Sequence, residues 1–358
     1  MDIRTSGSAA TAVELAAVEA VLGAAEADGD RVIRAGHAAR GRRHLLLPAL
    51  HALQDRVGWV SRGAIDLLAE RLSVAPAEIH GVTTFYHLLA TEPGPPLTVH
   101  VCDDIACRAA GNAGLLGELE RVAGPPGEEM FSGACWRRSA CLGLCERGSA
   151  ALVRRSGAEV DQLDVAVAPI TVEQVIGLLQ GEPPPPAEAA TAPLPQAGGA
   201  GLRLLRRAQG GSSTLPGFRA AGGLETLRRA LELGPEAVLA EVAASGLLGR
   251  GGAAFPASRK WEPVAASADH PHHVVCNADE SEPGTFKDRV LLERDPFGVL
   301  EALLLAGFAT GSARGYIYLR EEYPLARARI AEAIAALRGA GWLGPSVGGS
   351  GFAFEIEL

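Results

Sequence analysis

The sequence contains very little lysine and asparagine. Its two lysines are Lys260 and Lys287, and its two asparagines are Asn112 and Asn277. Arginine supplies the other 31 of the 33 basic residues. A lysine that remains in such a chain suggests a position that needs a compact ammonium group rather than a planar guanidinium. Because Lys260, Asn277 and Lys287 fall within 28 residues, this segment is the first place to search for chemistry.

Long apolar runs and an excess of positive charge are also missing. No stretch reaches the roughly eighteen uncharged apolar residues that a transmembrane helix requires. The N-terminus lacks the apolar core of a signal peptide. The net charge of −9 argues against a surface for nucleic acid. We therefore expect a cytoplasmic protein with no nucleic-acid partner and no direct membrane insertion.

The composition predicts a folded chain of several domains. Hydrophobic residues make up 47% and charged residues 21% of the 358 residues, as in globular proteins. Residues 181–200 contain six prolines and no periodicity, so we interpret them as a linker. The predicted organisation is an N-terminal helical extension (1–43), a helical arm (44–95), a small α/β domain (96–180), a Pro/Gly-rich linker (181–214) and a second α/β domain (215–358).

Helical patterns dominate the first 90 residues. Residues 1–30 are rich in alanine and predict a helix, and Ile65, Leu68 and Leu72 share one helix face. The basic stretch 31–43 is either a docking patch for an anionic partner or a solvated helix face.

Both later domains mix strands and helices. The first has an alternating strand at 97–102, a helix at about 112–123, a strand at 149–153 and a helix at 171–180, a unit of about thioredoxin size. The second has expected helices at 224–233, 236–245, 296–310 and 324–338 and expected strands at 273–277, 316–319 and 352–358. Alternating elements of this kind predict a parallel sheet that helices cover on both faces.

Four cysteines form two short-spaced pairs. Cys102 and Cys107 are separated by four residues at the end of a strand, and Cys141 and Cys145 by three residues in a loop. Four thiolates from two loops are able to hold a [2Fe–2S] cluster or a zinc ion, and unligated core thiols are the third alternative. Cys135 does not fit a four-ligand set, and we interpret it as a spare thiol.

A glycine-rich run and a polar strand end mark the second domain. The run Gly249–Gly252 precedes Lys260, and backbone amides beside an ammonium suit a phosphate. The strand that ends near Asn277 continues into Asp279 and Glu280, where parallel sheets place ligands. The plainer interpretation is a capped turn with salt-bridged charges.

Residues 44–180 resemble the E subunit of bacterial NADH:quinone oxidoreductase and its equivalents in NAD-reducing hydrogenases and formate dehydrogenases. Gly58-Trp-Val-Ser, Gly81-Val-Thr-Thr-Phe-Tyr and the two cysteine pairs carry the resemblance. It implies a helical arm and a thioredoxin-like domain whose [2Fe–2S] ligands are Cys102, Cys107, Cys141 and Cys145. The spacing from Phe131 to Cys141 is longer than in the family, and we interpret Cys135-Trp-Arg-Arg as a loop insertion.

Residues 224–358 resemble the F subunit, which carries FMN and oxidises NADH. The matching segments are 249–256, 260–261, 277–289 and 316–323. The resemblance implies that Phe255 lies near the NADH adenine and that Glu282 and Glu322 act on the nicotinamide side. The residues that it implies for cofactor binding are Gly249, Arg250, Gly251, Gly252, Phe255, Lys260, Asn277, Asp279 and Glu280.

This chain departs from the F-type pattern in two ways. Ala254, Ser258 and Glu321 stand where the family has glycine, so each adds bulk where backbones normally approach closely. The family also continues with a Cys-Gly-Glu-Glu segment, a ubiquitin-like domain and a [4Fe–4S] site that this sequence does not contain. We therefore expect an incomplete α/β FMN-binding domain, with the rest missing or supplied by another polypeptide.

The sequence thus predicts an NADH dehydrogenase (diaphorase) module that uses a [2Fe–2S] cluster, FMN and NAD. The expected partners are NADH and other redox subunits, one of them carrying further iron–sulfur clusters, in a cytoplasmic complex or one at the cytoplasmic face of a membrane. The alternative is a non-catalytic [2Fe–2S] electron carrier or assembly protein with a degenerate flavin domain.

Overall fold

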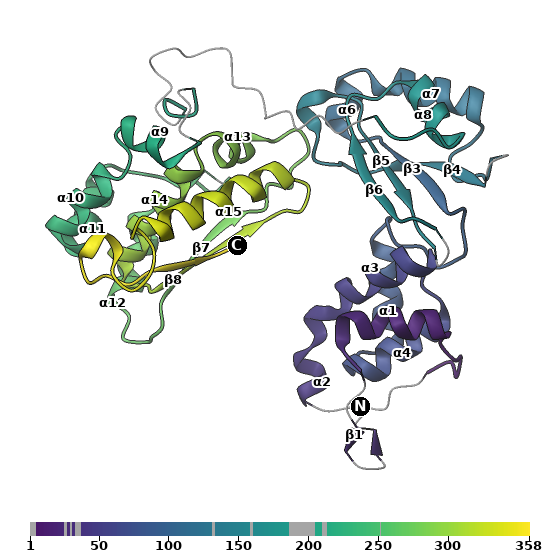
Figure 1. The fold of residues 1–358 in the computed structure, drawn as a ribbon, viewed down its shortest axis with the longest axis horizontal. Helices are drawn as coiled ribbons and strands as arrows, with labels where there is room; N and C mark the ends of the chain where they lie inside the picture. The colour runs from purple at the N-terminus through teal and green to yellow at the C-terminus, as the bar shows by residue number, and fades with distance from the viewer. Residues whose placement is uncertain are drawn as a thin grey trace. The chain divides into compact units, whose positions relative to one another are not determined.

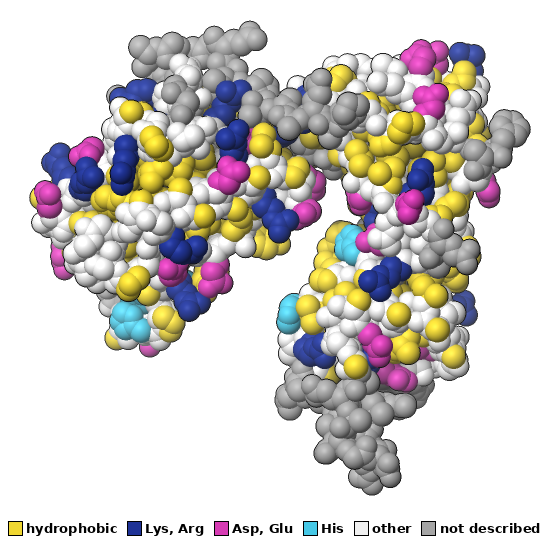
Figure 2. Space-filling view, viewed as in Figure 1, with side chains coloured by type: hydrophobic (Ala, Val, Ile, Leu, Met, Phe, Trp, Pro, Cys, Tyr) yellow, Lys and Arg dark blue, Asp and Glu magenta, His cyan; other side chains and the backbone are white. Residues whose placement is uncertain are grey.

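A computed structural model describes residues 5–24, 27–28, 31–32, 37–130, 133–157, 160–185, 205–209, 213–250 and 252–358. The chain divides into two compact units, Met1–Ala187 and Glu188–Leu358 (Figure 1). Basic and acidic side chains are interspersed on the visible face of each unit (Figure 2). Among the described residues, no helix has both the length and the apolar character needed to cross a bilayer.

The first unit begins with a helical arm around one apolar core. Its elements are α1 (Ala12–Leu22), β1 (Ala27–Asp28), β2 (Arg31–Val32), α2 (His37–Gly41), η1 (Arg43–Leu45), α3 (Leu46–Val57), α4 (Arg62–Leu72) and α5 (Pro76–Phe85). Ile65, Leu68 and Leu72 are buried together in this core, as predicted. The predicted helix over 1–30 is wrong in extent, because α1 begins at a Thr11–Glu14 capping box and the chain then turns into the β1–β2 pair.

A four-stranded sheet follows the arm. Its elements are β3 (Leu97–Cys102), α6 (Ile105–Ala109), α7 (Asn112–Ala123), β4 (Ala134–Ser139), η2 (Cys145–Arg147), β5 (Ala151–Arg155), β6 (Leu163–Val167) and α8 (Val172–Leu179). The strand order is β4-β3-β5-β6, with β3 parallel to β4 and antiparallel to β5. The interpretation of 135–138 as a loop insertion is wrong, because these residues form β4. Trp136 is fully buried there, while Arg137 and Arg138 face solvent and obscure the apolar pattern of the strand.

The second unit is a three-stranded parallel sheet with helices. Its elements are α9 (Leu215–Ala220), α10 (Glu225–Leu233), α11 (Pro235–Ala244), α12 (Ser258–Ala266), β7 (His273–Ala278), α13 (Lys287–Arg294), α14 (Pro296–Thr310), β8 (Arg314–Leu319), α15 (Pro324–Gly339), η4 (Val347–Gly349) and β9 (Glu355–Glu357). The predicted helix over 296–310 coincides with α14. The sequence did not predict α12 and α13.

The prediction that helices cover both faces of this sheet is wrong for the part of the chain that the structure describes. The strand order β7-β8-β9 proceeds in one direction. Right-handed crossovers therefore return α14 and α15 to the same face, where they pack with Ile317 and Ile356. On the opposite face, Val275 is 65% and Tyr318 68% exposed.

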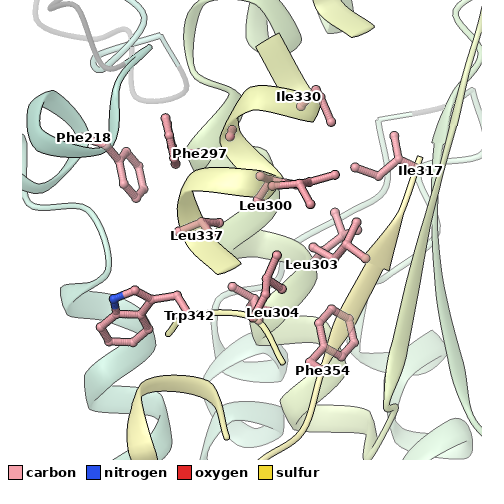
Figure 3. Close-up of a cluster of buried hydrophobic side chains, with 14 of the residues drawn as sticks. Phe218, Phe297, Leu300, Leu303, Leu304, Ile317, Ile330, Leu337, Trp342 and Phe354 are labelled. Atoms are coloured by element: carbon pink, nitrogen blue, oxygen red, sulfur yellow. The ribbon is translucent and has the colours of Figure 1, made fainter. Parts of the chain in front are cut away.

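The core of the second unit forms between α14, α15 and the sheet (Figure 3). Leu300 and Leu304 of α14 are fully buried and lie between Phe297 and the ring of Phe354. Burial of each such side chain contributes about 2 kcal/mol to the free energy of unfolding. This packing fixes the positions at which β7 and β8 end, where the predicted cofactor residues lie.

Candidate functional site

The four predicted cluster ligands form two cysteine pairs at one end of the thioredoxin-like sheet. The thiols of Cys102 and Cys107 are within hydrogen-bonding reach of each other. The Sγ atoms of Cys141 and Cys145 lie 3.2 Å apart. The two pairs adjoin, since Cys102 influences the pKa of Cys141. Cys102 and Cys107 are 1% exposed, and Leu144 and Ala150 pack against them.

Polar contacts hold the two cysteine-bearing loops together. Asp104 caps α6 by accepting from the amide of Ile105 at 2.7 Å, and it also accepts from the amide of Cys141 at 3.0 Å. The buried amide of Asn112 donates to the carbonyl of Cys102. The carboxylate of Asp104 thus joins the first loop to the second, and Asn112 holds the end of β3.

Burial raises the pKa of two of these thiols, those of Cys102 and Cys141. The pKa of Cys102 is raised to about 12, mainly by burial and in part by the neighbouring Cys107, against hydrogen bonds from the backbone amides of Asp104 and Leu142 that lower it. Burial also raises the pKa of Cys141 to about 12, against a 3.5 Å hydrogen bond to its sulfur from the amide of Gly143. Metal ligation requires thiolates, so a metal that binds here has to displace protons.

The disposition of the thiols fits two iron atoms better than one zinc ion. A tetrahedral zinc site needs all four thiolates around one centre, whereas a two-iron cluster takes two thiolates on each iron. Two adjoining pairs match the second pattern.

Cys135 lies away from these pairs. It is fully buried on β4 opposite Thr98, whose hydroxyl is 3.6 Å from its sulfur. Cys102 lies opposite Ser139, four residues further along β4, which corresponds to about 13 Å of strand. Cys135 is therefore not a ligand in this geometry.

In the second unit, polar side chains gather where β7 and β8 end. Asn277 lies beside Tyr318 in the parallel register, and both side chains are exposed. Asp279 follows β7, and its amide donates to the side-chain oxygen of Asn277 at 3.1 Å. Tyr318 was not among the predicted residues. No local pattern distinguished it, because tyrosine is common in strands.

Glu280 binds to protein groups rather than facing solvent. Its side chain is 1% exposed. Its carboxylate accepts from the amides of Asp288 at 2.9 Å and Arg289 at 3.2 Å, at the start of α13. It also accepts from the Tyr323 hydroxyl at 3.2 Å and from Lys287 at 3.4 Å. Glu280 thereby fixes the strand end to α13 and α15, while its contact with FMN stays a prediction.

The two predicted catalytic acids have different surroundings. Arg320 binds the Glu322 carboxylate through Nη2 at 2.7 Å and Nε at 3.1 Å, and this hydrogen bonding holds the pKa of Glu322 below its usual value. Glu282 is exposed, in the turn that a hydrogen bond from the amide of Thr285 closes at 3.0 Å.

The glycine-rich run forms a closed loop before α12. The amide of Gly249 donates to the carbonyl of Phe255 at 2.8 Å, and Leu248 bridges to Pro256. The Lys260 ammonium lies 5.8 Å from the centre of the Phe255 ring, which is 44% exposed. Arg250 and Gly252 are exposed on the same loop, and Gly251 lies outside the described residues.

The structure does not connect this loop directly to the strand ends. In the described part of the unit, no hydrogen bond or ion pair joins Lys260 to Asn277, Asp279 or Glu280. The glycine-rich loop with Lys260 and the ends of β7 and β8 are both exposed to solvent. They carry amide or ammonium groups, which are the hydrogen-bond donors that a phosphate and a polar ring system bind. The donor set therefore fits FMN, with Lys260 and the loop amides suited to its phosphate.

Only one of the three glycine replacements strains the backbone among the described residues. Ala254 has φ of 48°, in the region where a side chain costs about 1–2 kcal/mol. Ser258 begins α12 in a helical conformation, and Glu321 pairs with Arg327 at 3.6 Å. The structure thus shows a strained backbone at Ala254, and the expected crowding by the three side chains stays a prediction.

These features define a two-domain redox protein, in which a thioredoxin-like fold with paired cysteines precedes an α/β unit with polar strand ends. Comparison with known families makes the class specific. Residues 32–176 match the thioredoxin-like [2Fe–2S] ferredoxin family, and residues 242–357 match the Nuo51 FMN-binding domain. These matches confirm the predicted fold class and the two protein-bound cofactors. The roles of individual residues stay predictions.

The chain is also similar to subunits of known redox enzymes. The chain is 29% identical over 323 residues to the NAD-reducing hydrogenase HoxS subunit alpha of Cupriavidus necator, covering 89% of this chain and 53% of that one. It is 44% identical over 142 residues to an F-type NADH-quinone oxidoreductase subunit of Rhizobium meliloti, covering 39% and 34%. A crystal structure of NAD⁺-reducing [NiFe]-hydrogenase matches with a TM-score of 0.60 and 28% identity, covering 88% and 51%. The chain thus spans between about a third and about half of these relatives.

Proposed function

We propose that this chain is an NADH-oxidising diaphorase module, which passes electrons from NADH through FMN to iron–sulfur clusters of a larger redox complex. The observation that carries the proposal is the cluster of exposed amide and carboxylate groups at the ends of β7 and β8, in a domain of the FMN-binding family. FMN, when bound, supplies the conversion of a two-electron hydride donor into single electrons.

The chain's own residues would bind and orient the reactants. Lys260 and the amides of the 249–257 loop would hold a phosphate, and Asn277 and Asp279 would hydrogen-bond a polar ring. Glu322 stays ionised because Arg320 binds it. An ionised carboxylate beside a nicotinamide stabilises the positive charge that appears when NADH becomes NAD⁺. The two cysteine pairs would ligate the [2Fe–2S] cluster.

The proposal includes partners. The relatives are named as subunits of a hydrogenase and of a quinone oxidoreductase. We therefore propose that other redox subunits, one of them carrying further iron–sulfur clusters, accept the electrons. The proposed location is the cytoplasm, in a free complex or at the cytoplasmic face of a membrane-bound one.

An anaerobic NADH titration of the purified chain, reconstituted with FMN, iron and sulfide, tests this function. Bleaching of the flavin together with reduction of the cluster is the expected result. A cluster spectrum that does not change with NADH but bleaches with dithionite would contradict the proposed function for the chain alone. That second result would support a non-catalytic [2Fe–2S] carrier or assembly protein, which the strained backbone of Ala254 in the glycine-rich loop favours.

A further inference from the structure

Two neighbouring strand ends meet at one arginine. Ala278 at the end of β7 lies beside Leu319 at the end of β8 in the parallel register. Glu280 and Arg320 follow these residues, and Arg320 donates to the backbone carbonyl of Glu280. Arg320 therefore spans from the turn after β7 to the turn after β8.

Arg320 makes two further contacts, with the carboxylate of Glu322 and the ring of Tyr323. It binds Glu322 in a bidentate arrangement, at 2.7 Å and 3.1 Å. Its guanidinium carbon lies 5.2 Å from the centre of the Tyr323 ring. Its side chain is 9% exposed, although that of its partner Glu322 is 43% exposed. A buried planar cation thus holds a carboxylate that reaches solvent.

Tyr323, the residue on which Arg320 stacks, is itself held in place. Tyr323 is 1% exposed, and its hydroxyl donates to the buried carboxylate of Glu280. Arg289, on α13, lies 5.2 Å from the same ring and pairs with Glu293 at 2.7 Å. The ring of Tyr323 therefore touches two guanidinium groups, which limits the movement of Arg320.

We propose that Arg320 is the positioning residue of this site, and that it fixes the Glu322 carboxylate at the edge of the sheet where nicotinamide binds. The inference rests on the proposed function for the identity of the ligand. It needs arginine in particular, because a lysine makes a point contact and cannot hold both carboxylate oxygens or stack on Tyr323.

The matched control lies on the same strand. Arg314 begins β8 and pairs with Glu357 at 2.8 Å, but both side chains are more than half exposed. Exposed ion pairs of this kind contribute little to the stability of the fold. Arg314→Lys therefore makes the same chemical exchange at the opposite end of β8, away from the site.

The experiment is a double-mutant cycle in the full chain loaded with FMN and the cluster. Arg320→Lys and Glu322→Gln should each lower kcat/KM for NADH by about tenfold, and the double variant should lose no more than either single one. Arg314→Lys should keep the wild-type value. Independent losses that multiply to about a hundredfold would overturn the proposal, because Arg320 would then not act through Glu322.

A second measurement does not depend on turnover. A ¹³C titration of the Glu322 carboxyl in the chain without FMN should show its midpoint move upward in Arg320→Lys and stay in place in Arg314→Lys. An unchanged midpoint in Arg320→Lys would overturn the proposal. If the wild-type chain did not oxidise NADH, but Arg320→Lys still raised the midpoint of Glu322, the result would count against the proposed function and not against the role of Arg320.

A third variant covers the case in which Arg320→Lys does not fold. Glu322→Asp keeps the charge but shortens the side chain, so the bidentate contact is lost while Arg320 is retained. It should be as slow as Glu322→Gln if the position of the carboxylate matters. Wild-type kinetics in Glu322→Asp would contradict a positioning role.

Discussion

The Sγ atoms of Cys141 and Cys145 lie 3.2 Å apart at the end of the sheet that also carries the Cys102–Cys107 pair. Cys135 lies on β4 beside Thr98, four residues along the strand from Ser139, which pairs with Cys102. Cys102→Ser or Cys145→Ser should therefore abolish the visible absorption and the electron paramagnetic resonance signal of a reconstituted cluster.

Cys135→Ser is the matched control for these variants, and it should keep both signals with the same iron content. Normal cluster signals in Cys145→Ser would show that the assigned ligand set is wrong. A loss of signal in Cys135→Ser with unchanged thermal stability would place this thiol in the cluster site.

Ala254 has φ of 48° in the glycine-rich loop, so replacement by glycine should relieve strain. Ala254→Gly should raise the free energy of unfolding by about 1 kcal/mol and tighten FMN binding, measured by flavin fluorescence. Ala253 lacks a positive φ, so Ala253→Gly should lower stability by about 0.5–1 kcal/mol. Equal effects of the two exchanges would contradict the strain at Ala254.

Gly307 of α14 faces the ring of Phe354, which occupies the place where a side chain would begin. Gly307→Ala should destabilise the second unit by about 1–3 kcal/mol in urea unfolding, because the buried ring cannot move away freely. Gly339, at the end of α15, has open space around it. Gly339→Ala should be neutral or slightly stabilising, and a similar loss in both variants would remove the role assigned to Phe354.

Glu301 is buried on α14 and accepts from the amide of Leu227 at 3.3 Å. Burial raises the pKa of Glu301 above its usual value. The folded chain therefore holds this proton more tightly than the unfolded chain, and the stability that it contributes is present at low pH and lost as pH rises through the raised pKa.

Glu301→Gln should remove this loss of stability at higher pH, because the glutamine amide does not ionise. The difference in unfolding free energy between Glu301→Gln and the wild type should increase from pH 4.5 towards neutral pH, measured by urea denaturation at each pH. Glu332→Gln, on the exposed face of α15, reports the effect of the same exchange at the surface. A difference for Glu301→Gln that falls with rising pH would have the wrong sign.

Local patterns predicted most of the elements. The helices α7 and α14 and the strand β3 were found because each lies on one continuous stretch of sequence with a regular pattern. β4 was missed because two of its residues are exposed arginines, and the short helices α12 and α13 because neighbouring glycines and charges concealed them. Whether a strand is buried depends on its partners, and local sequence does not contain them.

The sequence by itself determined the kind of site: two closely spaced cysteine pairs, a glycine-rich loop, and a strand that ends in amide and carboxylate groups. These follow from residue type and spacing along a short stretch of chain. Only the tertiary structure decided that both crossover helices lie on one face of the sheet, that Glu280 is buried against α13, and that Arg320 holds Glu322. The physical reason is that the parallel register of β7 and β8 brings Arg320 and Tyr323 to Glu280, about forty residues away in sequence. This register depends on the strand partner, which local sequence does not contain.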